Sequence, residues 1–306
     1  MPELPDIVVY IRKLEPRIAG QKLEKIRLAS PFLLRSVSPS IQEGEGKTLL
    51  GLRRLGKRIV FELEDELFLV FHLMIAARFH WKKPAAKIPA RLGLAAFDFR
   101  SGALLLTEAS SRKRASLHLV RGEEALGQFE RGGLEPLEAD AEAFRSTLLG
   151  ENHTLKRALT DPRLFSGIGN AYSDEILHRA RLSPLLLTSR LDEGEIARLR
   201  DATRDVLLEW TERLDREAGD RFPEKVTAFR EGMAVHGRFR QPCPDCGSPI
   251  QRIVYAENES NYCARCQTGG KLLSDRLLAR LLKQDWPRTL EELEERRAQI
   301  ARRGGV

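Results

Sequence analysis

The sequence has no apolar run long enough to cross a membrane. Its longest apolar run extends from Leu67 to Ala77 and contains His72, whereas a membrane-spanning helix needs about 20 consecutive apolar residues. The first six residues, Met1 to Asp6, include two prolines and two acidic residues. They have neither the basic start nor the apolar stretch of a signal peptide. We therefore expect a cytoplasmic protein with no membrane partner.

Cysteine is scarce, and the few cysteines lie close together. The 306 residues include only Cys243, Cys246, Cys263 and Cys266, two C-x2-C pairs with 16 residues between them. This spacing is typical of a four-cysteine zinc site in which two turns are joined by a β-hairpin. The alternatives are disulfides, which a reducing cytoplasm disfavours, and a redox C-x2-C motif, which would not occur twice at this spacing. We predict one structural Zn²⁺ whose four thiolates leave no position for water.

Acidic residues are fewer than basic ones, 44 against 51, which gives a net charge of +7. A basic excess favours a polyanionic partner, although a solvated basic surface is a general alternative explanation. The hydrophobic content of 42% provides enough apolar side chains for packed cores and excludes wholesale disorder. At roughly 100–200 residues per domain, a chain of this length should form two domains or slightly more.

The hydrophobic pattern changes along the chain. Apolar residues on one helical face predict an N-terminal helix from Ile7, capped by Asp6, and strand patterns follow, with Leu67–Trp81 as one apolar strand region. Helical patterns then occupy 140–148, 155–159, 172–180 and 192–217, and charged helices are expected at 272–282 and 289–303. The sequence therefore predicts a β-rich region, a helical region, a zinc ribbon and a helical tail.

Three separated motifs carry a family resemblance. Pro2-Glu3-Leu4-Pro5 follows Met1, residues 166–175 read Ser-Gly-Ile-Gly-Asn-Ala-Tyr-Ser-Asp-Glu, and the four-cysteine ribbon comes last. In this order they resemble the formamidopyrimidine-DNA glycosylase/endonuclease VIII family of base-excision repair enzymes over residues 2–270. The resemblance implies a multidomain α+β fold. Its parts would be an N-terminal β-sandwich catalytic domain with a flanking helix (2–121), a linker (122–138), a helix-two-turn-helix DNA-binding domain (139–234), a four-cysteine zinc finger with a β-hairpin (235–271) and a helical tail (272–306).

The resemblance also implies an activity, that of a bifunctional DNA glycosylase/AP lyase that removes oxidised bases from damaged DNA. Removal of Met1 would leave Pro2 with a secondary amine, a nucleophile of the same kind as a Schiff-base lysine. An α-amino group has a reference pKa of roughly 7.7–8.0, so a useful fraction is unprotonated near neutrality. Glu3 matches the general acid/base of the family. Lys57 matches a lysine that contacts the phosphate beside the lesion and assists β-elimination.

Further residues match DNA contacts of the family. Lys156 and Asn170 correspond to its phosphate contacts in the helix-two-turn-helix element. Asn258 stands where the zinc-finger hairpin normally has an arginine, so the hairpin lacks that charge and δ-elimination should be impaired. Met74 or Ile75 takes the position of the wedge that fills the space of an everted base.

A non-catalytic or partly active nucleic-acid-binding protein is the main alternative, because helix-two-turn-helix elements and zinc ribbons also occur in proteins that only bind. Retention of Met1 would favour that alternative. A zinc-dependent hydrolase is disfavoured, because no His/Asp/Glu set at metal-ligand spacing accompanies the ribbon. We expect a bacterial-type cytoplasmic monomer that is associated with the nucleoid when it binds DNA.

Overall fold

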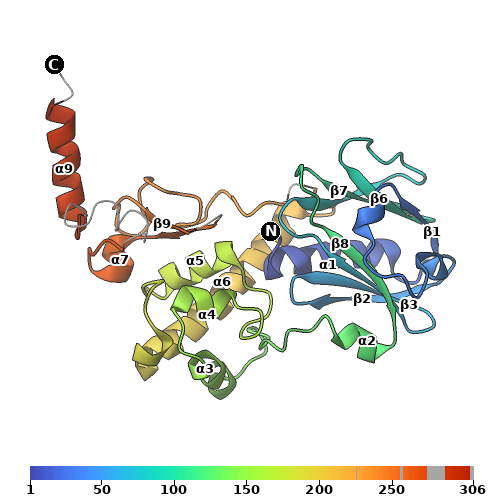
Figure 1. The fold of residues 1–306 in the computed structure, drawn as a ribbon, viewed down its shortest axis with the longest axis horizontal. Coiled ribbons are helices and arrows are strands. Elements are labelled where there is room, and N and C mark those ends of the chain that lie inside the picture. Colours follow the sequence, from blue (N-terminus) through green and yellow to red (C-terminus); the bar gives the residue numbers. More distant parts are fainter. Residues whose placement is uncertain (225, 256–257, 274–286, 304–306) are drawn as a thin grey trace. The chain divides into compact units, whose positions relative to one another are not determined.

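The computed structural model describes residues 1–224, 226–255, 258–273 and 287–303 (Figure 1). Among these residues, no helix combines the length and the apolar character that a membrane crossing requires. The chain forms two compact units: residues 1–133 pack with 207–228, and residues 134–206 pack with the described residues from 229 onward. The domain limits expected from the sequence remain a prediction, because compactness divides the chain at other positions.

The first unit contains helix α1 (Leu4–Ile18) and two antiparallel sheets of four strands each. The strand order is β1-β6-β7-β5 in one sheet and β2-β3-β4-β8 in the other. The strands are β1 (Leu23–Leu28), β2 (Leu49–Leu55), β3 (Arg58–Leu63), β4 (Leu67–His72), β5 (Ala77–Lys82), β6 (Gly93–Phe99), β7 (Gly102–Glu108) and β8 (Ser116–Arg121), with 3-10 turns η1 (Pro31–Leu33) and η2 (Ile41–Gly44).

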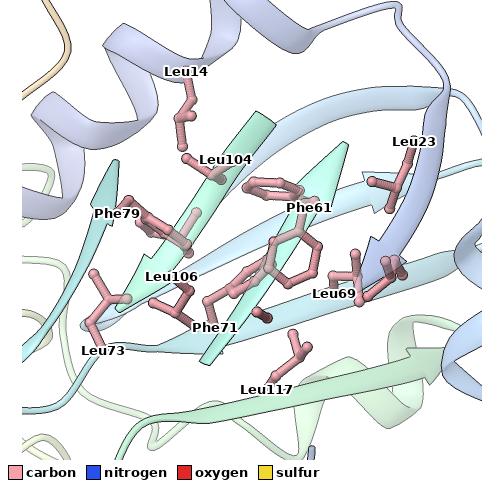
Figure 2. Close-up of a cluster of buried hydrophobic side chains, with 14 of the residues drawn as sticks. Leu14, Leu23, Phe61, Leu69, Phe71, Leu73, Phe79, Leu104, Leu106 and Leu117 are labelled. Carbon is pink, nitrogen blue, oxygen red and sulfur yellow. The ribbon is translucent and has the colours of Figure 1, made fainter. Parts of the chain in front are cut away.

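The core of this unit receives alternate side chains from both sheets and one face of α1, as a period of two in the strands requires (Figure 2). Phe71 lies at its centre, with its ring 4.8 Å from Phe61, 5.0 Å from Phe97 and 5.3 Å from Phe79 between centroids. The edge-to-face and tilted geometries are those that aromatic rings favour. The strand region expected over 67–81 contains two strands, β4 and β5, which belong to different sheets and are separated by a turn.

The segment after β8 differs from the expected linker. It begins with helix α2 (Glu123–Gly127), whose Leu126 packs with Val60 and Val70 on the other face of the second sheet. Phe129 joins this cluster, and its ring meets that of His118 at 4.8 Å. These apolar contacts fix the segment on the sheet, which its content of Gly and Glu did not indicate.

The second unit is helical and ends in a small hairpin. Its helices are α3 (Ala141–Leu149), α4 (Leu155–Thr160), α5 (Asn170–Arg179), the first part of α6 (Glu193–Ala218), α7 (Ala264–Thr268) and α9 (Leu290–Arg303), with a 3-10 turn η3 (Thr188–Arg190). Strands β9 (Gln251–Tyr255) and β10 (Asn258–Tyr262) pair antiparallel. The α+β class and the order of its parts are confirmed. Of the helix expected at 272–282, residues 272–273 are not helical and the remainder lies outside the described residues.

We predict that Gly102→Ala destabilises the first unit. A Cβ at this position would lie 2.5 Å from Cζ2 of Trp81 and 2.7 Å from the backbone oxygen of Lys82. Overpacking of this kind costs about 1–3 kcal/mol, which urea unfolding would measure. Gly127→Ala is the matched control, because its Cβ would meet no atom within 4 Å. Equal unfolding midpoints for the two variants would contradict the close packing of Gly102 against Trp81 and Lys82.

Candidate functional site

The N-terminus is fixed by the start of α1. The helix begins at Leu4, three residues earlier than expected, and Glu3 is its N-cap. The Glu3 N–H donates to Oδ2 of Asp6 at 2.8 Å, so Asp6 lies within the first turn and caps from inside the helix. Pro2 is buried and Glu3 is only 2% exposed. Capping and burial together give this short terminal segment one defined position.

Two basic side chains act on the terminal amine. Burial lowers the pKa of the Met1 amine below its usual value near 8; Glu3 opposes this shift, while Arg78 and Lys57 add to it. Lys57 lies in the two-residue turn between β2 and β3, where Gly56 has a φ of +60°. The predicted residues Glu3 and Lys57 thus both lie within electrostatic reach of the Met1 amine, next to Pro2. Sequence reasoning missed Arg78, an arginine of β5 (Ala77–Lys82) that no motif distinguishes.

The predicted wedge residues lie in the turn between β4 and β5. Met74 has a φ of +52°, a left-handed conformation that costs a non-glycine residue about 1 kcal/mol. Ile75 is 54% exposed, and its carbonyl accepts a hydrogen bond from Arg78 Nη1 at 3.1 Å. Arg78 therefore connects this turn to the surroundings of the N-terminus.

In the second unit, the carboxylate of Asp174 on α5 is completely buried and has four partners. Lys156 Nζ lies 2.6 Å from Oδ1 and Ser260 donates to the same oxygen at 2.7 Å. His236 Nδ1 lies 2.8 Å from Oδ2, and the Asn261 N–H donates to Oδ2 at 3.1 Å. Burial alone would raise the pKa of Asp174, but Lys156 and His236 outweigh burial and hold it below the ordinary range.

The adjacent residue, Glu175, holds a different segment. Its Oε1 accepts hydrogen bonds from the N–H groups of Val235 and His236, both at 2.9 Å, and Oε2 accepts one from Ala234 at 2.7 Å. Three backbone donors ahead of the cysteines are thereby satisfied by one carboxylate. Two consecutive acids on α5 thus hold the hairpin and the segment that precedes the cysteines.

The predicted DNA contacts of this unit lie around the same network. The buried ammonium of Lys156 also donates to the backbone oxygen of Asn170 at 2.7 Å. Asn170 is the first residue of α5, and its Nδ2 donates to the backbone oxygen of Glu259 at 2.9 Å. Asn258 begins β10 opposite Tyr255. The sequence motifs did not indicate that Lys156 would be buried, because its partner Asp174 lies 18 positions away.

The four cysteines converge at one point. Their Sγ atoms all lie within 4.8 Å of one another. Cys246 and Cys263 are 3.4 Å apart and Cys243 and Cys266 are 3.9 Å apart between sulfurs, longer than a disulfide bond of about 2.05 Å. His178 on α5 places Nε2 3.3 Å from Sγ of Cys243. The cluster has the donor set of a structural zinc site.

The thiol chemistry fits a cation at this point. Burial raises the pKa of Cys263 to about 11 and that of Cys266 upward as well. At Cys246, hydrogen bonds from Ser248 outweigh burial and lower the pKa to about 7. A divalent ion among the sulfurs would stabilise all four as thiolates, and its binding would release protons.

The fold and the cysteine cluster define a zinc-finger protein with a helix-two-turn-helix domain. Residues 1–117 match the model of the formamidopyrimidine-DNA glycosylase N-terminal domain, and residues 133–217 match that of its H2TH domain. Residues 240–269 match the zinc finger found in this glycosylase and in isoleucyl-tRNA synthetase. The chain belongs to the formamidopyrimidine-DNA glycosylase family.

Individual relatives support this membership. The formamidopyrimidine-DNA glycosylase of Heliobacterium modesticaldum is 33% identical over 280 residues, which cover 87% of this chain and 100% of the relative. That of Thermus thermophilus is 34% identical over 278 residues, 88% of this chain and 100% of the relative. A structure of a Lactococcus lactis glycosylase mutant with DNA containing Fapy-dG matches with a TM-score of 0.77 at 28% identity, over 87% of this chain and 100% of the other.

We predict that Asp174→Asn strongly destabilises the second unit. Removal of one charge from a buried pair leaves the other uncompensated and costs about 3–5 kcal/mol. Because the pKa of Asp174 is depressed in the folded state, its contribution should be complete above the unfolded pKa near 3.9 and should disappear as the pH falls through the folded pKa. Urea unfolding at several pH values would measure both effects.

Asp201→Asn is the control for this prediction. Its side chain is 60% exposed and pairs with Arg200 at the surface, where an ion pair contributes about 0–1 kcal/mol. A loss for Asp174→Asn no larger than for this control, or one that persists unchanged at acidic pH, would refute the assigned role of the carboxylate.

Proposed function

We propose that this protein is a bifunctional DNA glycosylase/AP lyase of base-excision repair that removes oxidised bases from damaged DNA. The observation that carries the proposal is the buried Pro2-Glu3 terminus with Lys57 and Arg78 acting on its amine, in a chain of this family. The Lactococcus lactis relative in complex with DNA containing Fapy-dG supports the substrate class. The proposed monomer would act on the nucleoid in the cytoplasm.

The proposed chemistry begins after removal of Met1. Burial lowers the pKa of the Met1 amine, and the same surroundings would favour an unprotonated nitrogen on the buried Pro2. That nitrogen attacks C1′ of the damaged nucleoside. The base leaves with the electron pair of its bond to C1′ and takes up the proton that the attacking amine loses. Glu3 transfers a proton to the sugar ring oxygen as the ring opens, and an iminium then joins Pro2 to C1′. Loss of a proton from C2′ then expels the 3′ phosphate in a β-elimination.

Lys57 is proposed to assist this elimination. An ammonium beside the phosphodiester neutralises the departing anion and lowers the barrier to its release. The exposed Ile75, with Met74 beside it in a turn tied to Arg78, is the proposed filler of the space that the everted base leaves.

The DNA contacts of the second unit are proposed at Asn170, at the start of α5, and at Asn258, at the start of β10. Asn258 carries no charge, so its grip on phosphate should be weak and the second, δ-elimination should be inefficient. For Lys156 the burial and the hydrogen bond to the Asn170 carbonyl favour an indirect contribution. We propose that Lys156 positions Asn170 through this hydrogen bond, while its charge is paired with Asp174.

One structural Zn²⁺ is proposed at Cys243, Cys246, Cys263 and Cys266. When bound, the ion would crosslink the two turns of the finger, and four thiolates leave it no position for chemistry. The close approach of His178 to Cys243 suits an N–H···S hydrogen bond to a zinc-bound thiolate. His178 would thus connect the finger to α5 beside Asp174 and Glu175.

A covalent adduct is the direct test of the activity. Borohydride should trap the full-length protein on duplex DNA with an oxidised purine or pyrimidine, because reduction makes the iminium permanent. Pro2→Gly, which replaces the secondary amine by a primary one, should lower the yield of the trapped adduct. Intact mass would check that Met1 is removed in each protein.

Two results would reject the catalytic proposal. One is the absence of any adduct with wild-type protein lacking Met1, and the other is an unchanged yield from Pro2→Gly. A wild-type protein that retains Met1 and binds lesion DNA without cleavage would instead support the alternative of a nucleic-acid-binding protein.

We predict that His178→Phe lowers zinc affinity by about 10- to 100-fold, the usual effect of removing a hydrogen-bond partner of a metal ligand. Chelator competition would measure the affinity, and the charge-transfer bands of the Co²⁺ form would report whether four thiolates still bind. His153→Phe is the control, because that histidine pairs with Glu151 at 2.6 Å. Equal affinity for His178→Phe and the wild type would exclude the hydrogen bond.

A further inference from the structure

Phe229 is an exposed aromatic side chain with a rigid support. It belongs to the segment that precedes the cysteines in the second unit and is 68% exposed. Its ring is stacked on the imidazole of His236, with centroids 5.5 Å apart and an interplanar angle of 16°. Exposure of a large apolar ring is unfavourable by itself, so the contacts that support it are informative.

The support beneath Phe229 is buried and strongly hydrogen-bonded. His236 is 5% exposed, its Nδ1 lies 2.8 Å from Oδ2 of Asp174, and its N–H donates to Glu175. These contacts fix the imidazole plane on which the Phe229 ring rests. The buried network of α5 therefore determines the orientation of an exposed ring.

The absence of a side chain at Gly237 leaves room for the ring of Phe229. A Cβ there would lie 2.6 Å from Cδ1 of Phe229, and the φ of +70° disfavours any other residue. The Gly237 N–H also donates to Oδ1 of Asn261 at 2.7 Å, which connects this position to β10. The backbone at Gly237 therefore lies close to the ring of Phe229.

Two exposed cations lie in the same unit as Phe229. The guanidinium groups of Arg240 and Arg252 both lie over the ring of Phe239, at 5.1 Å and 4.3 Å. Arg252 also forms a surface ion pair with Glu259 at 3.3 Å, whereas both arginines remain exposed. Aromatic faces interspersed with cations suit a strand of nucleic acid, which combines unstacked bases with phosphates.

We propose that Phe229 is a stacking platform for one unstacked nucleobase of the bound DNA. The inference rests on the proposed function, because it assumes a DNA partner, but it assigns a binding role to a residue outside the proposed chemistry. Because the Phe229 side chain is already held in one orientation, it loses little conformational entropy when a base stacks on it. The exposed arginines of the same unit would attract phosphates of the bound strand.

The test is the affinity of full-length protein for a short single strand with a central 2-aminopurine, whose fluorescence falls on stacking. Phe229→Ala and Phe229→Leu should each weaken binding by about 5- to 150-fold, the contribution of one stacked base. Phe229→Tyr retains a ring and should stay within about twofold of wild type. Phe32→Ala is the matched control, since Phe32 is 74% exposed in the first unit.

The outcomes separate this inference from the proposed function. Wild-type affinity in Phe229→Leu would refute stacking, because leucine keeps the apolar contact without a ring. An equal loss in Phe32→Ala would also refute it. Failure of the wild type to bind any DNA would reject the proposed function together with the platform, whereas excision by a Phe229→Ala variant of unchanged affinity would reject the platform alone.

Discussion

The second unit depends on one buried negative charge. A carboxylate removed from water must be neutralised and hydrogen-bonded, and Asp174 obtains this from three separate parts of the chain. Lys156 comes from α4, His236 from the segment ahead of the cysteines, and Ser260 and Asn261 from β10. Satisfying that single group therefore brings a helix, a loop and a hairpin to one place. Glu175, the next residue, repeats the arrangement with backbone donors.

The first unit solves a different problem, namely how to hold a chain end in one position. Ends of chains are usually poorly ordered unless they are anchored. Here the cap formed by Glu3 and Asp6 and the burial of Pro2 anchor the end directly to α1, which packs on the aromatic core around Phe71. A terminal amine can serve as a precise reagent only under this condition, so the cap and the proposed chemistry have the same structural origin.

Local patterns in the sequence predicted the local features well. The spacing of the cysteines predicted their convergence, because two C-x2-C turns joined by a hairpin have few other arrangements, and the helical periods predicted α3 to α6. The features that failed depend on contacts between distant residues. The burial of Lys156 requires Asp174, the attachment of α2 requires the outer face of a sheet, and the division of 67–81 between two sheets requires knowledge of strand pairing. No motif marks Arg78 or Phe229, whose surroundings only the fold creates.

The shared carboxylate also constrains how this unit can evolve. Loss of Asp174 alone would leave the buried charge of Lys156 unpaired, and loss of Lys156 alone would remove a partner of the buried carboxylate of Asp174. A single substitution at either position would therefore be strongly destabilising. Positions 156, 174, 236 and 260 should therefore change together or remain fixed as a group across lineages. The start of β10 at Asn258 lies two residues before Ser260, and substitution there leaves the shared charge balance intact. The start of β10 is accordingly a position where a lineage can exchange one side chain for another without rebuilding the interior.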